Sequence, residues 1–238
     1  MLKKLLSSLI GLSLGAGALA DEASVKRNFE AKFGVKAESV VKAGYLGLYE
    51  IYADGQIIYG DEKGSAFILG PLIDGKTMKN VSQERMNRLS AIKWNDLPLD
   101  QAIRQVRGDG RRVLATFEDP NCGYCKRLAK DLLKLDNVTV YVFLYPILSP
   151  DSVDKSKRIW CADDRAKAWN DWMVDGRTPA GRNDCDTSAI ARNQEFGRKL
   201  NINGTPTLFF ADGERIPGAV PLARIEEKLS QTAGNGAH

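Results

Sequence analysis

Residues 113–126, VLATFEDPNCGYCK, join a short apolar run to a turn and then to two cysteines three positions apart. The apolar run at 113–117 predicts a buried strand, and the Asp-Pro-Asn sequence at 119–121 predicts the turn that follows it. A stripe of leucines predicts that a helix begins near Cys122; its members are Leu128, Leu132, Leu133 and Leu135. Two cysteines with this spacing at a strand-to-helix junction indicate thiol–disulfide exchange.

The two cysteines of this motif are expected to differ because they occupy different places on the helix. Cys122 lies at the helix start, where unpaired backbone N–H groups and the helix dipole lower the pKa of a thiol. The thiolate is the attacking species in disulfide exchange, so we assign Cys122 as the more exposed nucleophile and Cys125 as the buried resolving thiol. Gly123 and Tyr124 lie between the sulfurs, where residue choice tunes the balance between dithiol and disulfide.

The composition excludes several other chemistries. The one histidine among 238 residues is His238, which leaves no internal imidazole for a Ser-His-Asp hydrolase, a Cys-His protease or a histidine-ligated metal. The formal net charge is only +4, and basic residues are scattered among acidic ones, which disfavours nucleic-acid binding. We therefore predict no cofactor and no metal. A Cys₄ zinc site and a purely structural CxxC disulfide are the alternatives, and the wide spacing of Cys161 and Cys185 argues against zinc.

Residues 1–20 predict a cleaved export signal. Lys3 and Lys4 precede an apolar stretch at 5–19, and Ala-Leu-Ala at 18–20 matches a cleavage site with small residues. A membrane anchor is the alternative, but the apolar stretch is shorter than the ~20 residues that a spanning helix needs. The short basic segment is typical of bacterial export, so the mature chain is predicted to be periplasmic.

Cys161 and Cys185 form the second cysteine pair. The periplasm is oxidising and cysteines there tend to be paired, so these two are predicted to form a permanent structural disulfide. Closing a loop of this length stabilises a fold by roughly 3 kcal/mol in the chain-entropy model. A second redox-active pair and a free thiol are the alternatives.

The chain divides into two halves with different patterns. A helix at 23–33 and strands near 39–41, 48–52, 56–59 and 66–69 predict a small antiparallel domain over residues 21–80, with a hairpin turn at 53–55. Residues 82–107 predict a helical connector, including a second helix over 98–106. From residue 111 the order is strand, helix, strand (138–144), helices (152–201), two strands near 207–216 and a last helix from 221. This order predicts an α/β domain with mixed strand directions.

Several motifs together resemble the DsbC family of periplasmic protein disulfide isomerases, which belongs to the thioredoxin superfamily. They are FEDPNCGYCK at 117–126, IWCA at 159–162, NGTPT at 203–207 and GPLID at 70–74. The resemblance covers the whole mature chain. It implies an α+β, cystatin-like dimerisation domain at 21–80, a helical linker at 81–108, and an α/β, thioredoxin-like catalytic domain with a helical insertion at 109–232.

The resemblance also implies an assembly and partners. These are a V-shaped homodimer with both CGYC motifs facing an apolar cleft, chaperone activity, and electrons supplied by the membrane reductase DsbD. Thr205 and a cis Pro206 would lie against Cys122 and, with Gly123 and Tyr124, align an extended substrate peptide. Thioredoxin carries a buried aspartate six residues before its first cysteine, where this chain has Thr116. The pattern does not assign the nearby Glu118 and Asp119 to the interior, so the sequence does not decide whether Cys125 has a carboxylate proton acceptor.

The resulting hypothesis is a periplasmic disulfide isomerase that reshuffles or reduces wrong disulfides in misfolded exported proteins. A related periplasmic thiol reductase, which reduces sulfenic acids, is one alternative, and a monomeric dithiol oxidase is another. A non-enzymatic holdase, whose cleft binds unfolded chains, is the third.

Overall fold

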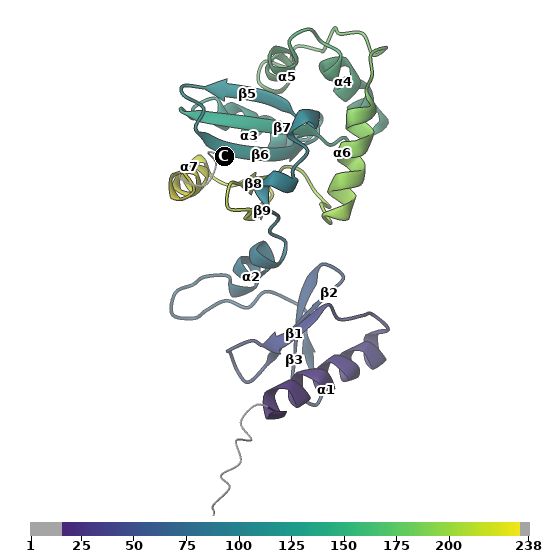
Figure 1. Ribbon diagram of the computed structural model, residues 1–238, viewed down its shortest axis with the longest axis vertical. Helices are drawn as coiled ribbons and strands as arrows, with labels where there is room; N and C mark the ends of the chain where they lie inside the picture. Colours follow the sequence, from purple (N-terminus) through teal and green to yellow (C-terminus); the bar gives the residue numbers. More distant parts are fainter. Residues whose placement is uncertain (1–15, 234–238) are drawn as a thin grey trace, which may run out of the picture. The chain divides into compact units, whose positions relative to one another are not determined.

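The computed structural model describes residues 16–233, which form two compact units, one ending at Met86 and the other beginning at Asn87 (Figure 1). Most of the predicted export signal at 1–20 lies outside the described residues, and the first helix begins at Ala16. The predicted signal and the exact domain limits therefore stay predictions. No helix among the described residues has the length and apolar character needed to cross a membrane.

The first unit is a helix on a small antiparallel sheet. Its elements are α1 (Ala16–Phe33), β1 (Ser39–Lys42), β2 (Tyr49–Ala53), β3 (Gln56–Gly60) and β4 (Phe67–Ile68), with the strands in sequence order. Val25 and Phe29, one helical turn apart, are buried against the strands. The predicted hairpin turn joins β2 to β3, with both Asp54 (φ 49°) and Gly55 (φ 70°) in the left-handed region that its tight geometry requires.

The connector is less helical than predicted. It contains α2 (Val81–Leu89) and two single turns, η1 (Trp94–Asp96) and η2 (Leu99–Gln101). The helix predicted over 98–106 is wrong, because β5 (Ile103–Arg107) is a strand that pairs antiparallel with β7 (Val138–Leu144). Its residues alternate between buried and exposed from Ile103 to Val106, the period of a strand.

The second unit is built on a five-stranded sheet in the order β5-β7-β6-β8-β9. The other strands are β6 (Arg112–Glu118), β8 (Thr207–Phe210) and β9 (Arg215–Pro217). Only β6 and β7 run parallel to each other, as the strand–helix–strand order predicts. The helices are α3 (Gly123–Leu132), α4 (Pro150–Trp160), α5 (Arg165–Met173), α6 (Ser188–Lys199) and α7 (Leu222–Gln231).

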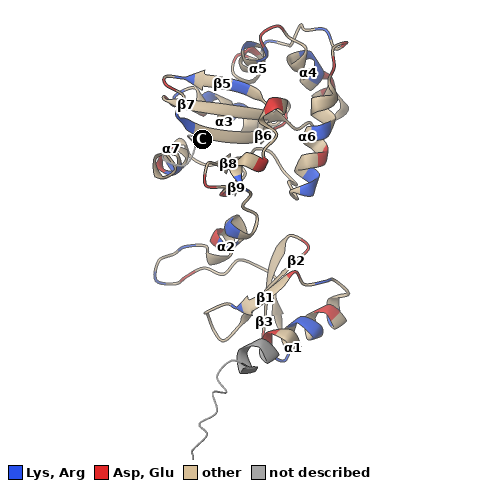
Figure 2. Cartoon of the chain, in the orientation of Figure 1, with Lys and Arg blue, Asp and Glu red and all other residues tan. Residues whose placement is uncertain are grey.

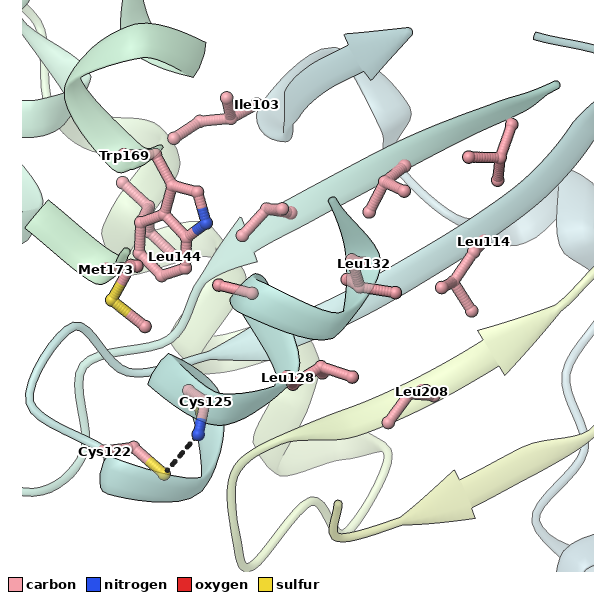
Figure 3. Close-up of a cluster of buried hydrophobic side chains, with 14 of the residues drawn as sticks. Ile103, Leu114, Cys122, Cys125, Leu128, Leu132, Leu144, Trp169, Met173 and Leu208 are labelled. Atoms are coloured by element: carbon pink, nitrogen blue, oxygen red, sulfur yellow. Dashed lines mark hydrogen bonds between the residues drawn. The ribbon is translucent and has the colours of Figure 1, made fainter. Parts of the chain in front are cut away.

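Alternate residues of the strands point to opposite faces of the sheet and pack into two different hydrophobic cores. One face carries Leu114 and Leu208, which pack with Leu128 and Leu132 of α3 and with both cysteines of the motif (Figure 3). The opposite face is aromatic; its buried members include Phe117, Tyr145, Phe143 and Phe209. Because both faces are covered, every residue of β6 from Leu114 to Glu118 is buried, and the thiols lie at the edge of a packed core.

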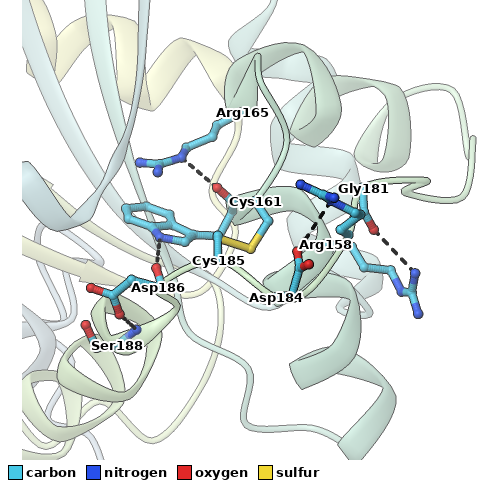
Figure 4. Close-up of a disulfide and its surroundings, with 10 residues drawn as sticks. Arg158, Cys161, Arg165, Gly181, Asp184, Cys185, Asp186 and Ser188 are labelled. Carbon is cyan, nitrogen blue, oxygen red and sulfur yellow. Dashed lines mark hydrogen bonds and ion pairs between the residues drawn. A yellow bond between two sulfur atoms is a disulfide. The ribbon is translucent and has the colours of Figure 1, made fainter.

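The helices α4, α5 and α6 form the predicted helical insertion. Cys161, which caps the C-terminus of α4, is joined to Cys185 by a disulfide (Figure 4). Beside this bridge the Trp160 indole donates a hydrogen bond to the carbonyl of Asp186, and the Arg165 guanidinium lies 3.8 Å from the Trp160 ring centroid. These contacts join the end of α4 to the segment that precedes α6.

Charges of both signs are mixed along the helices of each unit, as on α1 and α6 (Figure 2). Many of the exposed pairs sit one turn apart on one helix, such as Lys167 with Asp171 and Lys199 with Glu195. Such pairs support helices weakly.

Candidate active site

The motif begins where β6 ends and the chain turns into α3. The Cys122 amide donates a hydrogen bond to the carbonyl of Asp119 (3.0 Å), which closes the turn. Cys122 is the N-cap of α3, and its Sγ accepts a hydrogen bond from the Cys125 amide at 3.3 Å (Figure 3). The sulfur thereby takes the place of a capping oxygen and faces the positive end of the helix. This is the arrangement that the sequence pattern predicts.

A loop far away in sequence completes the environment of Cys122. The Thr205–Pro206 peptide bond is cis, and it leads directly into β8. In its protonated form the Cys122 thiol donates to the carbonyl of Thr205, with 3.3 Å between Sγ and the oxygen. The structure thus brings Thr205 and Pro206 to the motif, while Cys161 and Cys185 belong to the insertion.

The environment strongly favours the thiolate of Cys122 and lowers the pKa of its thiol to about 5. The largest cause is the hydrogen bond from the Cys125 side chain, and the backbone amides of Cys125 and Tyr124 act in the same direction. Burial opposes them, since the side chain is only 6 % exposed. Hydrogen bonds to the charged form outweigh desolvation here.

Cys125 is the chemical opposite of its partner. It is fully buried, and burial raises the pKa of its thiol far above the ordinary value, with the Cys122 sulfur and the Glu118 carboxyl acting in the same direction. One sulfur is therefore ionised at neutral pH while the other holds its proton. Both are free thiols in the structure.

Asp119 fixes the turn before the motif, a role that the sequence pattern does not reveal. Its buried carboxylate accepts hydrogen bonds from the amides of Asn121 (2.8 Å), Ile147 (2.8 Å) and Leu148 (2.9 Å). It thus ties the loop after β7 to the loop before Cys122. Leu148 (57 % exposed) and Tyr124 (59 % exposed) are apolar side chains left at the surface beside these loops.

The helical insertion also contacts the turn that precedes Cys122. The Trp172 indole of α5 donates a hydrogen bond to the carbonyl of Pro120 at 2.6 Å. Lys126 Nζ lies 4.0 Å from the centre of the same ring. The lysine that follows the motif in sequence therefore rests on an aromatic face, and it is not among the groups that lower the Cys122 pKa.

Glu118 is in the interior, where the sequence pattern had not placed it. The last residue of β6, it has no exposed surface. The Thr116 hydroxyl donates to its Oε1 (2.7 Å), and its Oε2 is buried without a hydrogen-bond partner. Burial raises the pKa of this carboxyl to about 8. Extending the predicted strand by one residue would have revealed it, since alternate residues share a face.

Within the described residues, no three His, Cys, Asp or Glu side chains gather in a way that could hold a metal ion. The four cysteines do not converge, because two of them are bridged in the insertion. The chemistry of the site therefore lies in two thiols, a buried carboxyl and the backbone around them.

A reactive thiolate at a helix start, a buried second thiol and a cis-proline loop on a mixed sheet define a thioredoxin-fold dithiol oxidoreductase. Comparison with known families agrees: residues 99–233 match the thioredoxin-like domain, and residues 16–83 match the disulfide bond isomerase protein N-terminal domain.

Comparison with known relatives identifies the family within this class of oxidoreductases. The chain is 47 % identical over 206 residues to the probable thiol:disulfide interchange protein DsbC of Bordetella parapertussis, covering 87 % of this chain and 73 % of that one. It is 28 % identical over 220 residues to DsbC of Escherichia coli K12, covering 90 % and 89 %. A disulfide interchange protein from Neisseria gonorrhoeae superposes with a TM-score of 0.55 at 42 % identity, over 60 % of this chain and all of that one. The protein belongs to the DsbC family of thiol:disulfide interchange proteins.

Proposed function

We propose that the protein is a disulfide isomerase that reshuffles wrong disulfides in exported proteins. The observation that carries the proposal is the asymmetry of the motif, with an ionised Cys122 beside a protonated, buried Cys125. An isomerase needs a nucleophile that is ready at neutral pH and is also a good leaving group. A low thiol pKa supplies both properties.

The reaction begins when the Cys122 thiolate attacks one sulfur of a substrate disulfide. A mixed disulfide forms between Cys122 and the substrate, and the second substrate sulfur leaves as a thiolate. That thiolate, or another one in the substrate, then attacks the mixed disulfide and displaces Cys122. The substrate acquires a new pairing, the enzyme returns to its dithiol form, and no electrons are gained or lost.

Cys125 resolves the mixed disulfide when no substrate thiol attacks it. It attacks Cys122, the substrate leaves reduced, and the enzyme is left with a Cys122–Cys125 disulfide that a dithiol donor must reduce. Membrane reductase DsbD is the proposed donor, on the strength of the family. Thr205 and Pro206 are proposed to align an extended substrate segment, with the exposed Tyr124 ring as an apolar contact.

Export to the periplasm, homodimer formation through the first unit and a chaperone activity complete the proposal. The matched N-terminal domain and the predicted signal at 1–20 support the first two of these. Sedimentation equilibrium of the mature chain should give twice the monomer mass. A monomer would favour the dithiol oxidase instead, because an oxidase needs no cleft between subunits.

The test is the recovery of ribonuclease A activity from a preparation with scrambled disulfides. Wild type should restore activity, whereas Cys122→Ala should match the uncatalysed background. Cys125→Ala is the matched control, because it keeps the nucleophile: it should retain part of the reshuffling and accumulate mixed disulfides. Equal recovery with wild type and Cys122→Ala would refute the proposal.

A further inference from the structure

Two positively charged side chains directly follow the CGYC motif. Lys126 and Arg127 lie near the start of α3, where the helix dipole disfavours positive charge and where the first turn holds no acidic residue. In the part of the chain that the structure describes, neither side chain forms an ion pair. Neither is among the groups that lower the pKa of the Cys122 thiol. Activation of the nucleophile therefore does not account for these two charges.

Aromatic rings hold both charges close to the motif. Lys126 Nζ lies 4.0 Å from the centre of the Trp172 ring, whose indole nitrogen binds the Pro120 carbonyl before the motif. The Arg127 guanidinium carbon lies 5.4 Å from the centre of the Tyr124 ring, which stands between the two cysteines and is 59 % exposed. A guanidinium that rests on a ring keeps the N–H donors at its edge available to a carboxylate.

The surface between the motif and these charges is open. Lys126 and Arg127 follow Gly123 by three and four positions, which places all three residues on one face of α3. Gly123 is exposed, and a Cβ at this position would have no neighbouring atom within 4 Å. The opposite face of the helix, which carries Cys125 and Leu128, is buried in the core. A substrate side chain can therefore lie over Gly123 within reach of both cations.

The acidic groups around this face are already engaged or buried. Two precede the motif and have no exposed surface; they are Glu118 and Asp119. Asp131, further along α3, pairs with Lys134 at 2.6 Å. Asp151, at the start of α4, pairs with Lys155 and accepts a hydrogen bond from the Asn121 side chain. The face of α3 beside Cys122 therefore presents positive charge to an approaching chain.

We propose that Lys126 and Arg127 bind an acidic side chain of the substrate, so that the protein prefers disulfides whose cysteines have acidic neighbours. This inference rests on the dithiol reaction proposed above. Attack by Cys122 joins the substrate cysteine to the start of α3, which brings the residues beside that cysteine to the face that carries both cations. A carboxylate there meets two charges that the fold leaves unpaired. Charge complementarity of this kind raises the rate of encounter and selects among partners.

Three chromogenic peptides test this preference directly. Each carries one cysteine joined to thionitrobenzoate by a disulfide, with Glu, Gln or Lys on both sides of the cysteine. The Cys122 thiolate attacks the peptide sulfur, a Cys122–peptide disulfide forms, and the electron pair of the broken bond leaves with the coloured thionitrobenzoate anion. Stopped-flow absorbance at pH 7 and about 0.1 M salt gives the rate constants. The Glu peptide should react about 10-fold faster than the Gln peptide and the Lys peptide slowest, and about 1 M salt should remove most of the difference.

Substitutions at the two cations should change the ratio of the Glu-peptide rate to the Gln-peptide rate. Lys126→Gln and Arg127→Gln should each lower the ratio about 3-fold, as expected for one exposed ion pair. Lys126→Glu combined with Arg127→Glu should reverse the order of the peptides, whereas Arg127→Lys should keep most of the ratio. Arg111→Gln is the matched control, because it removes an exposed positive charge at the other end of β6, roughly 20 Å along the strand. Its ratio should match wild type, since salt screens a charge at that distance.

The outcomes distinguish this inference from the proposed function. Absence of colour with every peptide would refute the dithiol reaction itself. Equal rates for the three peptides would refute only the preference for acidic neighbours. An equal loss of preference in Arg111→Gln and Arg127→Gln would assign the effect to the overall charge of the protein and overturn the inference. The alkylation midpoint of Cys122 should stay near pH 5 in each variant. A shifted midpoint would mean that the cations act through the thiol, which would also overturn it.

Discussion

The two cysteine pairs of this protein occupy opposite ends of helices. Cys122 caps the N-terminus of α3, where backbone N–H groups stabilise a thiolate, whereas Cys161 caps the C-terminus of α4, where carbonyl groups oppose one. Exposure does not explain their difference, because Cys185 is exposed while both cysteines of the motif are buried. The position of a sulfur on a helix, rather than its access to water, separates the reactive pair from the structural one.

The sequence spacing of the two cysteines within each pair also distinguishes the reactive pair from the structural one. Cys122 and Cys125 are one turn apart, so a bridge between them constrains the unfolded chain very little. Cys161 and Cys185 are 24 positions apart, and their bridge encloses the segment of the insertion that carries α5. One bridge can open and close without much cost to the fold, and the other stabilises it.

Removal of the insertion bridge should give the largest effect. Cys161→Ala combined with Cys185→Ala should lower the free energy of unfolding by roughly 3 kcal/mol, because the unfolded chain regains its loop entropy. Urea unfolding of the oxidised protein followed by circular dichroism measures the loss. Attack of Cys122 on 5,5′-dithiobis(2-nitrobenzoate), followed by the release of the first coloured thionitrobenzoate anion, should stay at the wild-type rate below the unfolding transition. Loss of that release in a folded variant would make the second pair part of the chemistry.

The second-largest expected effect is a difference in redox equilibrium between the two cysteine pairs. At pH 7 a Cys122 thiol with a pKa of about 5 stabilises the dithiol form on the order of 100-fold relative to an ordinary thiol. In glutathione buffers the CGYC pair should become half reduced while Cys161–Cys185 stays fully oxidised, as read by alkylation and mass spectrometry. Reduction of both pairs at one glutathione ratio would contradict the helix-terminus explanation.

The pH dependence of Cys122 alkylation is a smaller expected effect, and it measures the ionisation of Cys122 directly. A lowered pKa means that Cys122 is a thiolate above about pH 5 and is protonated below it. The stabilisation of the folded, reduced form by this thiolate is thus lost as the pH falls through 5. Iodoacetamide should react with Cys122 about 10-fold more slowly at pH 4 than at pH 6, with no further change up to pH 8. A midpoint near 8.5 would show that the helix terminus does not act on this sulfur.

The sequence predicts local features of this molecule better than distant contacts. The hairpin at 53–55, the helix start at Cys122 and the strand–helix–strand order depend on neighbouring residues, and all agree with the structure. The strand β5 was missed because a five-residue alternation in a run following a proline also fits a short helix. The burial of Glu118 depends on where β6 ends, which varies by a residue or two in any prediction from sequence.

The partners of Asp119 and Pro120 could not be predicted because they lie 28 to 52 residues away. Asp119 binds amides of a loop whose sequence carries no motif, and Trp172 comes from the insertion. The contact of the Thr205–Pro206 loop with Cys122 was predicted only through the family resemblance. Contacts of this kind depend on the finished tertiary structure and not on the local pattern.

The smallest expected effect concerns Trp172, which links the region of the structural disulfide to the region of the CGYC motif. It lies on α5, within the segment that the Cys161–Cys185 bridge closes, and donates to Pro120 beside the motif. Trp172→Phe keeps an aromatic face for Lys126 and removes only this hydrogen bond. The loss should cost about 1 kcal/mol of stability and leave the Pro120 carbonyl unpaired. If the insertion also positions the turn, the attack of Cys122 on 5,5′-dithiobis(2-nitrobenzoate) should slow a few-fold while the alkylation midpoint of Cys122 stays near pH 5. A shifted midpoint would instead mean that the insertion sets the ionisation of Cys122, and the two regions would then act as one site.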